Sequence, residues 1–499
     1  MAQKPSASQC SGRTKATYDK QGLLPRLAVD VLINILNFLR PCDIIGVRRT
    51  CKLLQEITKL RTVWVNALGA LMEQHSISEA MFPLREMRVD ILEHVALSPH
   101  RLVSLVKRSS AIEPSSIRTL SRDLSKEEKD TFAMQGVGQV NDLILACGGR
   151  YLVSNSVNSS RWSVSTLMSV WDLGICANDT ALVLTRYLEQ KIDLELRLFF
   201  PDPDVSGTFY VVSVQRSSAI TVLIHRVLLS DSPSITSFSA LELPVTAPTS
   251  PCLVELVPNS SRIVISSQHD EKVSLWIWDF LLNTGARLMG PECSLFPYRD
   301  TIMFASKDKV SIFNVPSTLH SYVPGQEAIS KYEPSLVVTV PSKVSESYYI
   351  DYPNATPTPP KSTVVHYLLR LHPHQLTLLE ITDIFGRDSL IPKQLPIKKK
   401  ILDARDVRAF TALHRRDIDG CEGCLSLSGV DSDGTSICML NVVASPGAGK
   451  DPKIGFIKAS LNHLVNIDLV IQEFCTFLGR ECVLTAGGDV VIFDYLLPR

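Results

Sequence analysis

The sequence predicts an α+β protein in which an all-α N-terminal part precedes a long all-β part. From Leu23 to about Arg108, apolar residues recur at the spacing of amphipathic helices. From about Val137 to Arg499, short runs rich in Val, Ile, Thr, Tyr and Phe alternate with polar residues between turn clusters, which is typical of β-strands. The Ser-rich and charged stretch 109–136 lies between the two parts and indicates a linker.

The charge balance argues against two classes of partner. The 499 residues contain 51 Lys+Arg and 51 Asp+Glu, so the formal net charge is zero. Binding to nucleic acid or to an anionic membrane surface usually needs a basic field, which this chain lacks. The basic stretch Pro396–Arg405 is interpreted as a loop or a strand edge, where lysines hinder unwanted sheet pairing. We therefore expect no nucleic-acid partner and no membrane partner.

The N-terminus and the cysteines predict an intracellular location. Residues 1–22 are polar, are expected to be disordered, and lack the apolar core of a secretory signal. No run approaches the roughly 18 apolar residues that a membrane helix needs. The 12 cysteines are scattered, as is usual for reduced thiols. A cytoplasmic and/or nuclear location is expected.

The helical part begins with one apolar stripe, formed by Leu27, Val31, Leu32, Ile35, Leu36 and Leu39. Pro41 is expected to end this helix, and Asp43 to be the N-cap of the next one. Helical patterns continue in residues 63–74 and 90–108. The last of these is expected to be split at Pro99, with Ser98 as a cap.

The spacing of the N-terminal residues resembles a known family. The pattern comprises Leu27, Asp30, Val31, Leu32, Ile35, Leu36 and Leu39, then Asp43–Ile44, then Thr50–Cys51–Lys52, and finally Leu54, Ile57 and Trp64. It resembles an F-box, which places a domain at 23–68 and a helical connector at 69–108. Ala28, Asp30, Thr50 and Leu54 depart from the family pattern but leave its apolar frame intact. The arrangement as a whole resembles F-box proteins that are abundant in mushroom-forming fungi.

The resemblance implies a partner. Three short helices bury too little surface to be stable alone, and in the family the F-box completes its core against a Skp-type adaptor, which in turn binds a cullin and a RING subunit. The adaptor-binding residues implied are Leu27, Val31, Leu32, Ile35, Leu36, Ile44, Cys51, Leu54 and Trp64. Some of these must face the internal core instead, and the sequence does not separate the two groups.

The β part contains a loose repeat. Trp171–Asp172 and Trp278–Asp279 each close an apolar strand, and Phe313–Asn314 and Phe493–Asp494 are near-equivalents. Weaker markers are His225, Glu380 and Asn441. The pattern resembles a divergent WD-repeat β-propeller over 137–499, with about seven blades and with six or eight also open. This domain is expected to bind the protein substrate, through residues that the sequence does not identify.

The position of the last marker predicts how the propeller closes. The chain ends a few residues after Asp494, so the last blade lacks an outer strand of its own. Closing the sheet edge requires a segment from the other end of the β part. The linker 109–136 can supply it, and Ser115–Ser121 is the β-capable piece that we predict to pair with the final blade.

Few residues have the spacing of a catalytic, metal-binding or phosphate-binding site. Cys421 and Cys424 have the spacing of zinc ligands, but only Cys438 lies nearby, and a turn between strands is the favoured interpretation. Residues 444–452 lack the glycine and hydroxyl positions of a phosphate-binding loop. Arg150, Arg161, Arg216 and Arg262 lie near strands, but none is assigned to a binding face.

Together these features predict a protein without catalytic residues, metal or cofactor. We expect the substrate-recognition subunit of an SCF-type ubiquitin ligase. The alternative is a non-catalytic scaffold that uses the same two modules without a cullin.

Overall fold

The computed structural model describes residues 27–74, 77–108, 112–120, 139–159, 164–175, 181–188, 194–202, 205, 207–216, 219–229, 232–243, 252–257, 260–269, 272–291, 294–298, 301–305, 309–315, 319–321, 336–339, 346–348, 364–372, 375–382, 397–403, 418–421, 424–430, 437–443, 455–460 and 469–498. The expected disordered tail 1–22 and the rejected phosphate loop 444–452 lie outside them.

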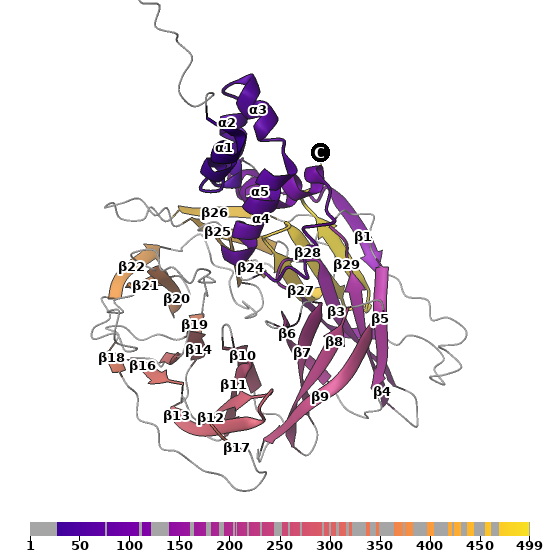
Figure 1. The fold of residues 1–499 in the computed structure, drawn as a ribbon. Helices are drawn as coiled ribbons and strands as arrows, with labels where there is room; N and C mark the ends of the chain where they lie inside the picture. Colours follow the sequence, from indigo (N-terminus) through magenta and orange to yellow (C-terminus); the bar gives the residue numbers. More distant parts are fainter. Residues whose placement is uncertain are drawn as a thin grey trace, which may run out of the picture. The chain divides into compact units, whose positions relative to one another are not determined.

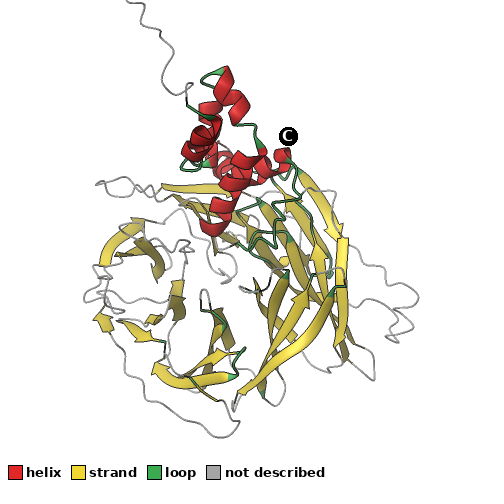
Figure 2. Cartoon of the chain, in the orientation of Figure 1, coloured by secondary structure: helices red, strands yellow, loops and turns green. Residues whose placement is uncertain are grey.

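The chain divides into two compact units, residues 1–67 and 68–499. Figure 1 shows the five labelled helices in the indigo, N-terminal part of the chain, and Figure 2 shows that the described elements after them are strands. The helices are α1 (Val29–Leu36), α2 (Pro41–Arg48), α3 (Lys52–Ile57), α4 (Arg61–Gln74) and α5 (Val89–Arg108). The predicted class, N-terminal helices followed by a mostly β region, is confirmed. None of the helices in the described residues has the length and hydrophobicity needed to cross a membrane.

The prediction that Asp43 caps the second helix is wrong. Helix α2 begins at Pro41, and its N-cap is Arg40 in an extended conformation. Proline is favoured at the first helical position because the missing N–H would have no partner there. Asp43 lies instead in the first turn, where its carboxylate accepts a hydrogen bond of 2.9 Å from Arg40 Nε and complements the positive end of the helix dipole.

The prediction that Pro99 splits the last helix is also wrong. Helix α5 runs continuously from Val89 to Arg108 with Pro99 inside it. Proline removes one hydrogen bond of the helix, but the apolar face of α5 is buried at Leu92, Val95 and Leu102. Tertiary packing therefore outweighs the local preference. Ser98 is not a cap, because its hydroxyl donates to the His94 carbonyl one turn earlier.

Helix α5 is attached to the C-terminal end of the β region. Arg101 donates a hydrogen bond of 3.2 Å to the Leu497 carbonyl and lies 2.8 Å from His94 Nδ1. Burial, and secondarily the charge of Arg101, lower the pKa of His94 to about 4. His94 is therefore neutral near pH 7 and can accept the hydrogen bond from Arg101.

The described strands form seven antiparallel sheets (Figure 1). In sheet order they are β2 (Gln139–Leu145), β3 (Tyr151–Ser159), β4 (Val164–Asp172) and β5 (Ala181–Leu188); β6 (Leu194–Pro201), β7 (Thr208–Arg216), β8 (Ile220–Leu228) and β9 (Ser234–Leu243); β10 (Cys252–Leu256), β11 (Arg262–His269), β12 (Lys272–Asp279), β13 (Thr284–Pro291) and β17 (His320–Ser321); β14 (Ser294–Tyr298), β15 (Thr301–Ala305), β16 (Lys309–Asn314) and β18 (Leu336–Thr339); β19 (Glu346–Tyr348), β20 (Val364–His372), β21 (Gln375–Thr382) and β22 (Ile397–Asp403); β23 (Ile418–Cys421), β24 (Cys424–Val430), β25 (Ile437–Val443) and β26 (Gly455–Ser460); and β27 (Leu469–Cys475), β28 (Arg480–Thr485), β29 (Val490–Asp494) and β1 (Ser116–Leu120).

The sheets repeat at the markers that the sequence singles out. Each marker lies on the third strand of a different sheet: Asp172 on β4, His225 on β8, Asp279 on β12, Asn314 on β16, Glu380 on β21, Asn441 on β25 and Asp494 on β29. Four of them end their strand, whereas His225, Glu380 and Asn441 lie two or three residues before the end. Four-stranded antiparallel sheets in sequence order are the form expected of propeller blades.

The last sheet takes its outer strand from a distant part of the chain. Strand β1 pairs antiparallel with β29, with Ser116 opposite Asp494 and Leu120 opposite Val490. Ser115 extends this pairing, since its amide donates to the Asp494 carbonyl at 2.8 Å. The strand predicted within Ser115–Ser121 is therefore present, on the sheet for which it was predicted.

The first and last sheets also share an apolar core. Leu143, Leu152 and Trp171 from the first sheet pack with Cys482, Leu484, Val490 and Ile492 from the last. A second core joins the sheet of β6–β9 to the sheet of β10–β13, with Tyr210, Ile224, Trp276 and Trp278 among its members. In these two places, neighbouring sheets thus bury apolar side chains against each other, which stabilises the unit.

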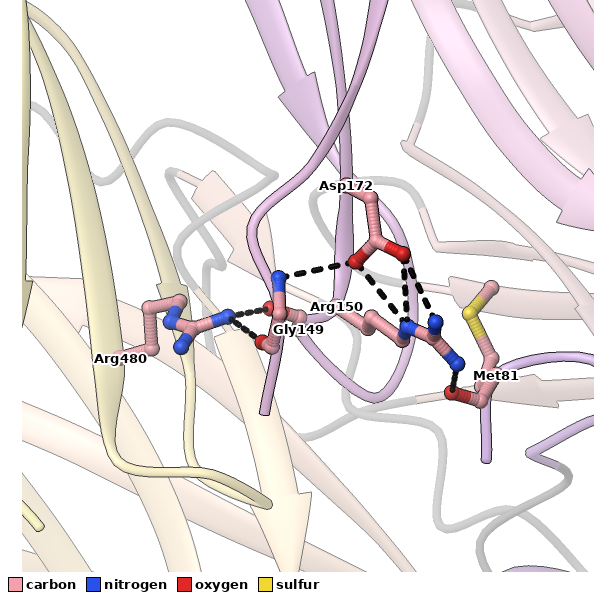
Figure 3. Close-up of polar contacts among 6 residues, drawn as sticks. Met81, Gly149, Arg150, Asp172 and Arg480 are labelled. Carbon is pink, nitrogen blue, oxygen red and sulfur yellow. Dashed lines mark hydrogen bonds and ion pairs between the residues drawn. The ribbon is translucent and has the colours of Figure 1, made fainter. Parts of the chain in front are cut away.

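A buried arginine joins the first and last sheets (Figure 3). The side chain of Arg480 is 1% exposed. Its Nη1 donates to the carbonyls of Gly149 at 2.7 Å and Gly174 at 2.8 Å, both in loops of the first sheet. Its Nε pairs with Asp494 at 2.6 Å, and Asp494 is also paired with Arg118 of β1 at 3.1 Å. One cation thus connects the end of the β region, its beginning and the closing strand.

Gly149 is required at this junction. Its φ is +75°, and a Cβ there would lie 2.9 Å from Cys475 Sγ. Other residues rarely adopt such a φ, and the close approach lets the Gly149 carbonyl reach Arg480. Beside it, Arg150 pairs with Asp172 at 2.7 Å and donates to the Met81 carbonyl at 3.1 Å (Figure 3).

We predict that Arg480→Ala lowers the free energy of unfolding by about 3–5 kcal/mol, because it leaves the buried Asp494 carboxylate without one of its two cations and two carbonyls without their donor. Urea unfolding followed by tryptophan fluorescence measures this. The matched control is Arg262→Ala, whose pair with Asp279 is longer at 3.6 Å and whose arginine side chain is 26% exposed; because solvent screens that charge and Asp279 keeps its hydrogen bonds from Ser261 and Leu282, it should cost clearly less than Arg480→Ala. Equal losses in the two variants would contradict the role given to Arg480.

We also predict a pH dependence that arises from Glu481. This carboxyl is fully buried and accepts hydrogen bonds from Tyr495 Oη and Gln472 Nε2. Burial raises its pKa from 4.5 to about 7, although both hydrogen bonds oppose the shift. The folded state therefore holds this proton more tightly than the unfolded state, so stability falls as pH rises from about 4.5 through 7, by on the order of 3 kcal/mol.

Glu481→Gln should remove that part of the pH dependence. Melting temperatures of wild type and variant, measured between pH 4.5 and 8, give the comparison. The two curves should separate as the pH rises, with the variant relatively more stable at pH 8. Parallel curves would contradict the assignment.

Candidate functional site

The first unit is a three-helix module with a small core. Leu32 and Leu36 of α1, Ile44 of α2, and Leu54 and Ile57 of α3 are buried. Val63 and Trp64, at the start of α4, complete the core. The core side chains of α1 are four residues apart, so they share one face of the helix. The helix is thereby divided into an inner face and an outer face.

A polar cluster anchors Trp64 in this core. The indole Nε1 donates to the Thr58 carbonyl at 2.8 Å, and Arg48 Nη2 donates to the same oxygen at 3.0 Å. The Arg48 guanidinium also lies 5.5 Å from the centre of the Trp64 ring, a cation–π contact. The Thr58 hydroxyl donates to the Leu54 carbonyl at 2.8 Å. Helix α2, the C-terminal end of α3 and the start of α4 are thus held together around the Thr58 carbonyl.

The outer face of α1 is apolar and exposed. Leu27, Val31, Ile35 and Phe38 are spaced by four, four and three residues, so they form one stripe along and just beyond the helix. Their side chains are 40%, 44%, 40% and 90% exposed. We call these four residues the α1 stripe. An apolar row at helical spacing that does not face the module's own core is typical of a helix that packs against a partner.

The structure sorts the nine residues expected to bind an adaptor into two groups. Leu27, Val31, Ile35 and Cys51 are exposed. Leu32, Leu36, Ile44, Leu54 and Trp64 are buried in the core of the module, with at most 8% exposure. The second group packs beneath the exposed residues. The sequence predicts that some of the nine face the internal core, and these five do so.

Four exposed apolar residues of the module were missed by the sequence reasoning. Val29 of α1 is 45% exposed, Phe38 extends the α1 stripe, and Leu53 and Leu60 are each 39% exposed on and after α3. Phe38 could have been found, because it lies seven residues after Val31 and three after Ile35. Leu53 could not, since it is adjacent to Leu54 and only the fold shows which of the two faces inward.

Three of the four arginines that the sequence analysis names form ion pairs within their own sheets. Arg150 pairs with Asp172, Arg262 with Asp279 and Arg216 with Glu195. Two of these acids are the strand-end markers, so the Arg–Asp pairs belong to the framework of the sheets. Arg161 lies outside the described residues. Within the described part of the chain, no group of three or more His, Cys, Asp and Glu side chains is placed to hold a metal ion.

Comparison with known proteins agrees with the helical module. Residues 24–66 match the family model of the F-box domain. That range includes all four members of the α1 stripe and the Trp64 cluster. A comparison with curated proteins finds no match.

Solved structures similar to the chain include the WD40 domain of SCAP from fission yeast, at 10% identity and a TM-score of 0.35, covering 72% of this chain and 96% of that one. Hsv2 of Kluyveromyces lactis is 12% identical with a TM-score of 0.32, over 61% of this chain and 75% of that one. The Dos1 propeller is 11% identical with a TM-score of 0.37, over 74% of this chain and 81% of that one.

The β unit is described by its sheet topology. In the helical module, the spacing of the apolar residues, the buried core and the family model agree. The chain carries an F-box domain at residues 24–66, followed by a β region built from propeller-type sheets.

Proposed function

We propose that this protein is the substrate-recognition subunit of an SCF-type cullin–RING ubiquitin ligase. The F-box would bind a Skp-type adaptor and, through it, the cullin and the RING subunit. The β unit would hold the target protein. The observation that carries the proposal is the α1 stripe, an exposed apolar row on a module whose family model is the F-box domain.

The energetics of the α1 stripe support a stable protein contact. Fully burying a Val, Ile, Leu or Phe side chain is worth about 1.5–3 kcal/mol. The members of the stripe are 40% to 90% exposed, so a partner can still remove much of their surface from water. Leu32 and Leu36 anchor the opposite face of α1 in the core, so the helix is ordered in the free module. This lowers the entropy cost of binding.

The role proposed for the chain is positioning. F-box and propeller domains are typically non-catalytic interaction modules. A receptor of this kind raises the effective concentration of the target at the conjugating enzyme and contributes no reacting group. Helix α5 is bonded to the C-terminal residues of the β region, which gives the proposed target-binding unit a firmly attached helical extension. We propose that the protein acts in the cytoplasm and/or the nucleus.

We predict that Val31→Asp with Ile35→Asp weakens adaptor binding by about a hundredfold or more. Each change replaces apolar contact with a carboxylate that would be buried without a partner, and about 1.4 kcal/mol corresponds to a tenfold change in affinity. Because both side chains are exposed in the free module, the fold should be retained. Titration of purified adaptor by calorimetry, with circular dichroism of each variant, measures both effects.

The matched control is Gln55→Asp with Thr62→Asp, which adds the same two negative charges at exposed positions outside the α1 stripe. It should bind the adaptor like wild type. Leu32→Asp is a different case, since that side chain is 2% exposed and its loss of binding would come from unfolding. Wild-type affinity in the Val31/Ile35 variant would contradict adaptor binding through the stripe.

A scaffold that binds the adaptor but no cullin is the competing function. The two are separated by purifying the chain from cells through its adaptor and probing for the cullin. We expect the cullin to co-purify with wild type and to be lost with the Val31/Ile35 variant. Adaptor without cullin would favour the scaffold.

A further inference from the structure

Two cysteines occupy directly opposed register positions at the end of one pair of strands. Cys421 is the last residue of β23, and Cys424 is the first residue of β24. The register places Cys421 directly opposite Cys424. Directly opposed residues of an antiparallel pair lie on the same face of the sheet. The pair is independent of the F-box and of the function proposed above.

The backbone separation suits a covalent bond. The Cα atoms of directly opposed residues in an antiparallel pair are about 4.5 or 5.5 Å apart, depending on the type of pair. Disulfides span Cα separations of about 4.4–6.8 Å. The Cα separation of such a pair therefore falls within the range that a disulfide spans.

A metal is a poorer match for the same pair. A structural zinc site takes four ligands. Cys438 is the nearest further cysteine in the sequence, but it lies opposite Gly429, five residues along β24 from Cys424. At about 3.4 Å per residue, that places it about 17 Å away along the strand. The two positions thus suit a bond to each other better than a shared metal.

We propose that Cys421 and Cys424 are a site of reversible oxidation, at which hydrogen peroxide converts the two thiols into an intramolecular disulfide. One thiolate attacks a peroxide oxygen, the O–O bond breaks, and a sulfenic acid and hydroxide form. The second thiol then attacks the sulfenyl sulfur, so that the S–S bond forms and the S–O bond breaks. Two water molecules leave, both sulfurs are oxidised, and both peroxide oxygens are reduced.

The disulfide would fasten two strands at a junction between sheets. Strand β23 is the first strand of its sheet and neighbours β27, the first strand of the last sheet. The bond would hold β23 to β24 at the end where the pair is joined by only Glu422 and Gly423. Oxidation would therefore protect residues 418–430 of the full chain against opening.

The experiment uses the full chain carrying Cys438→Ser, so that tryptic peptide 417–450 keeps only the two cysteines in question. The protein is treated with peroxide, alkylated, digested and measured by mass spectrometry. We expect the peptide to lose the mass of two hydrogen atoms, alkylation of both cysteines to fall together, and dithiothreitol to restore it. Hydrogen exchange of residues 418–430 should slow in the oxidised protein.

Matched variants and an internal thiol supply the controls. In Cys424→Ser the internal disulfide cannot form, and exchange of 418–430 should not respond to peroxide. Cys147 is exposed and alone in its tryptic peptide; it should stay alkylatable under conditions that oxidise the pair. Independent oxidation of Cys421 and Cys424 to sulfinic acid, mixed disulfides with other chains, or oxidation no faster than that of Cys147 would overturn the proposal.

Discussion

The β unit depends on one buried cation. Arg480 has three partners that lie far apart in the sequence: Asp494 in its own sheet, and the carbonyls of Gly149 and Gly174 in the first sheet. A guanidinium presents five donors in a fixed plane, so it can satisfy all three at once. Asp494 extends the network to Arg118 of β1. A buried charge that lost these partners would be costly, so the contacts are maintained together or lost together.

This network also secures the closing strand. Strand β1 has five residues, as many as its partner β29, and its positions alternate between half-buried and exposed. It is held by its pairing with β29 and by the ion pair of Arg118 with Asp494. The apolar core between the first and last sheets lies directly behind. The chain thereby covers a sheet edge that would otherwise be open to pairing with another molecule.

In the F-box, the burial of apolar side chains differs between the two faces of one helix. Among the described residues, the inner face of α1 packs into the module's own core, and the outer face carries the exposed α1 stripe. A module of three short helices gains only modest stability from its own burial. Burial of the exposed stripe by a partner would add to that stability, and this is how the small core relates to the proposed binding role. The Arg48–Thr58–Trp64 cluster maintains the geometry of the module until such a partner binds.

The sequence by itself determined the class of each part, because hydrophobic periodicity is local. The helical spacing ending at Trp64, the seven strand markers and the strand within Ser115–Ser121 were all readable from the chain. Only the tertiary structure decided which apolar residues of α1 and α3 face inward, that α5 continues through Pro99, and that Arg150, Arg216 and Arg262 serve ion pairs within the sheets. These outcomes depend on contacts between segments distant in sequence. Periodicity places a residue on a face, but only packing determines what that face meets.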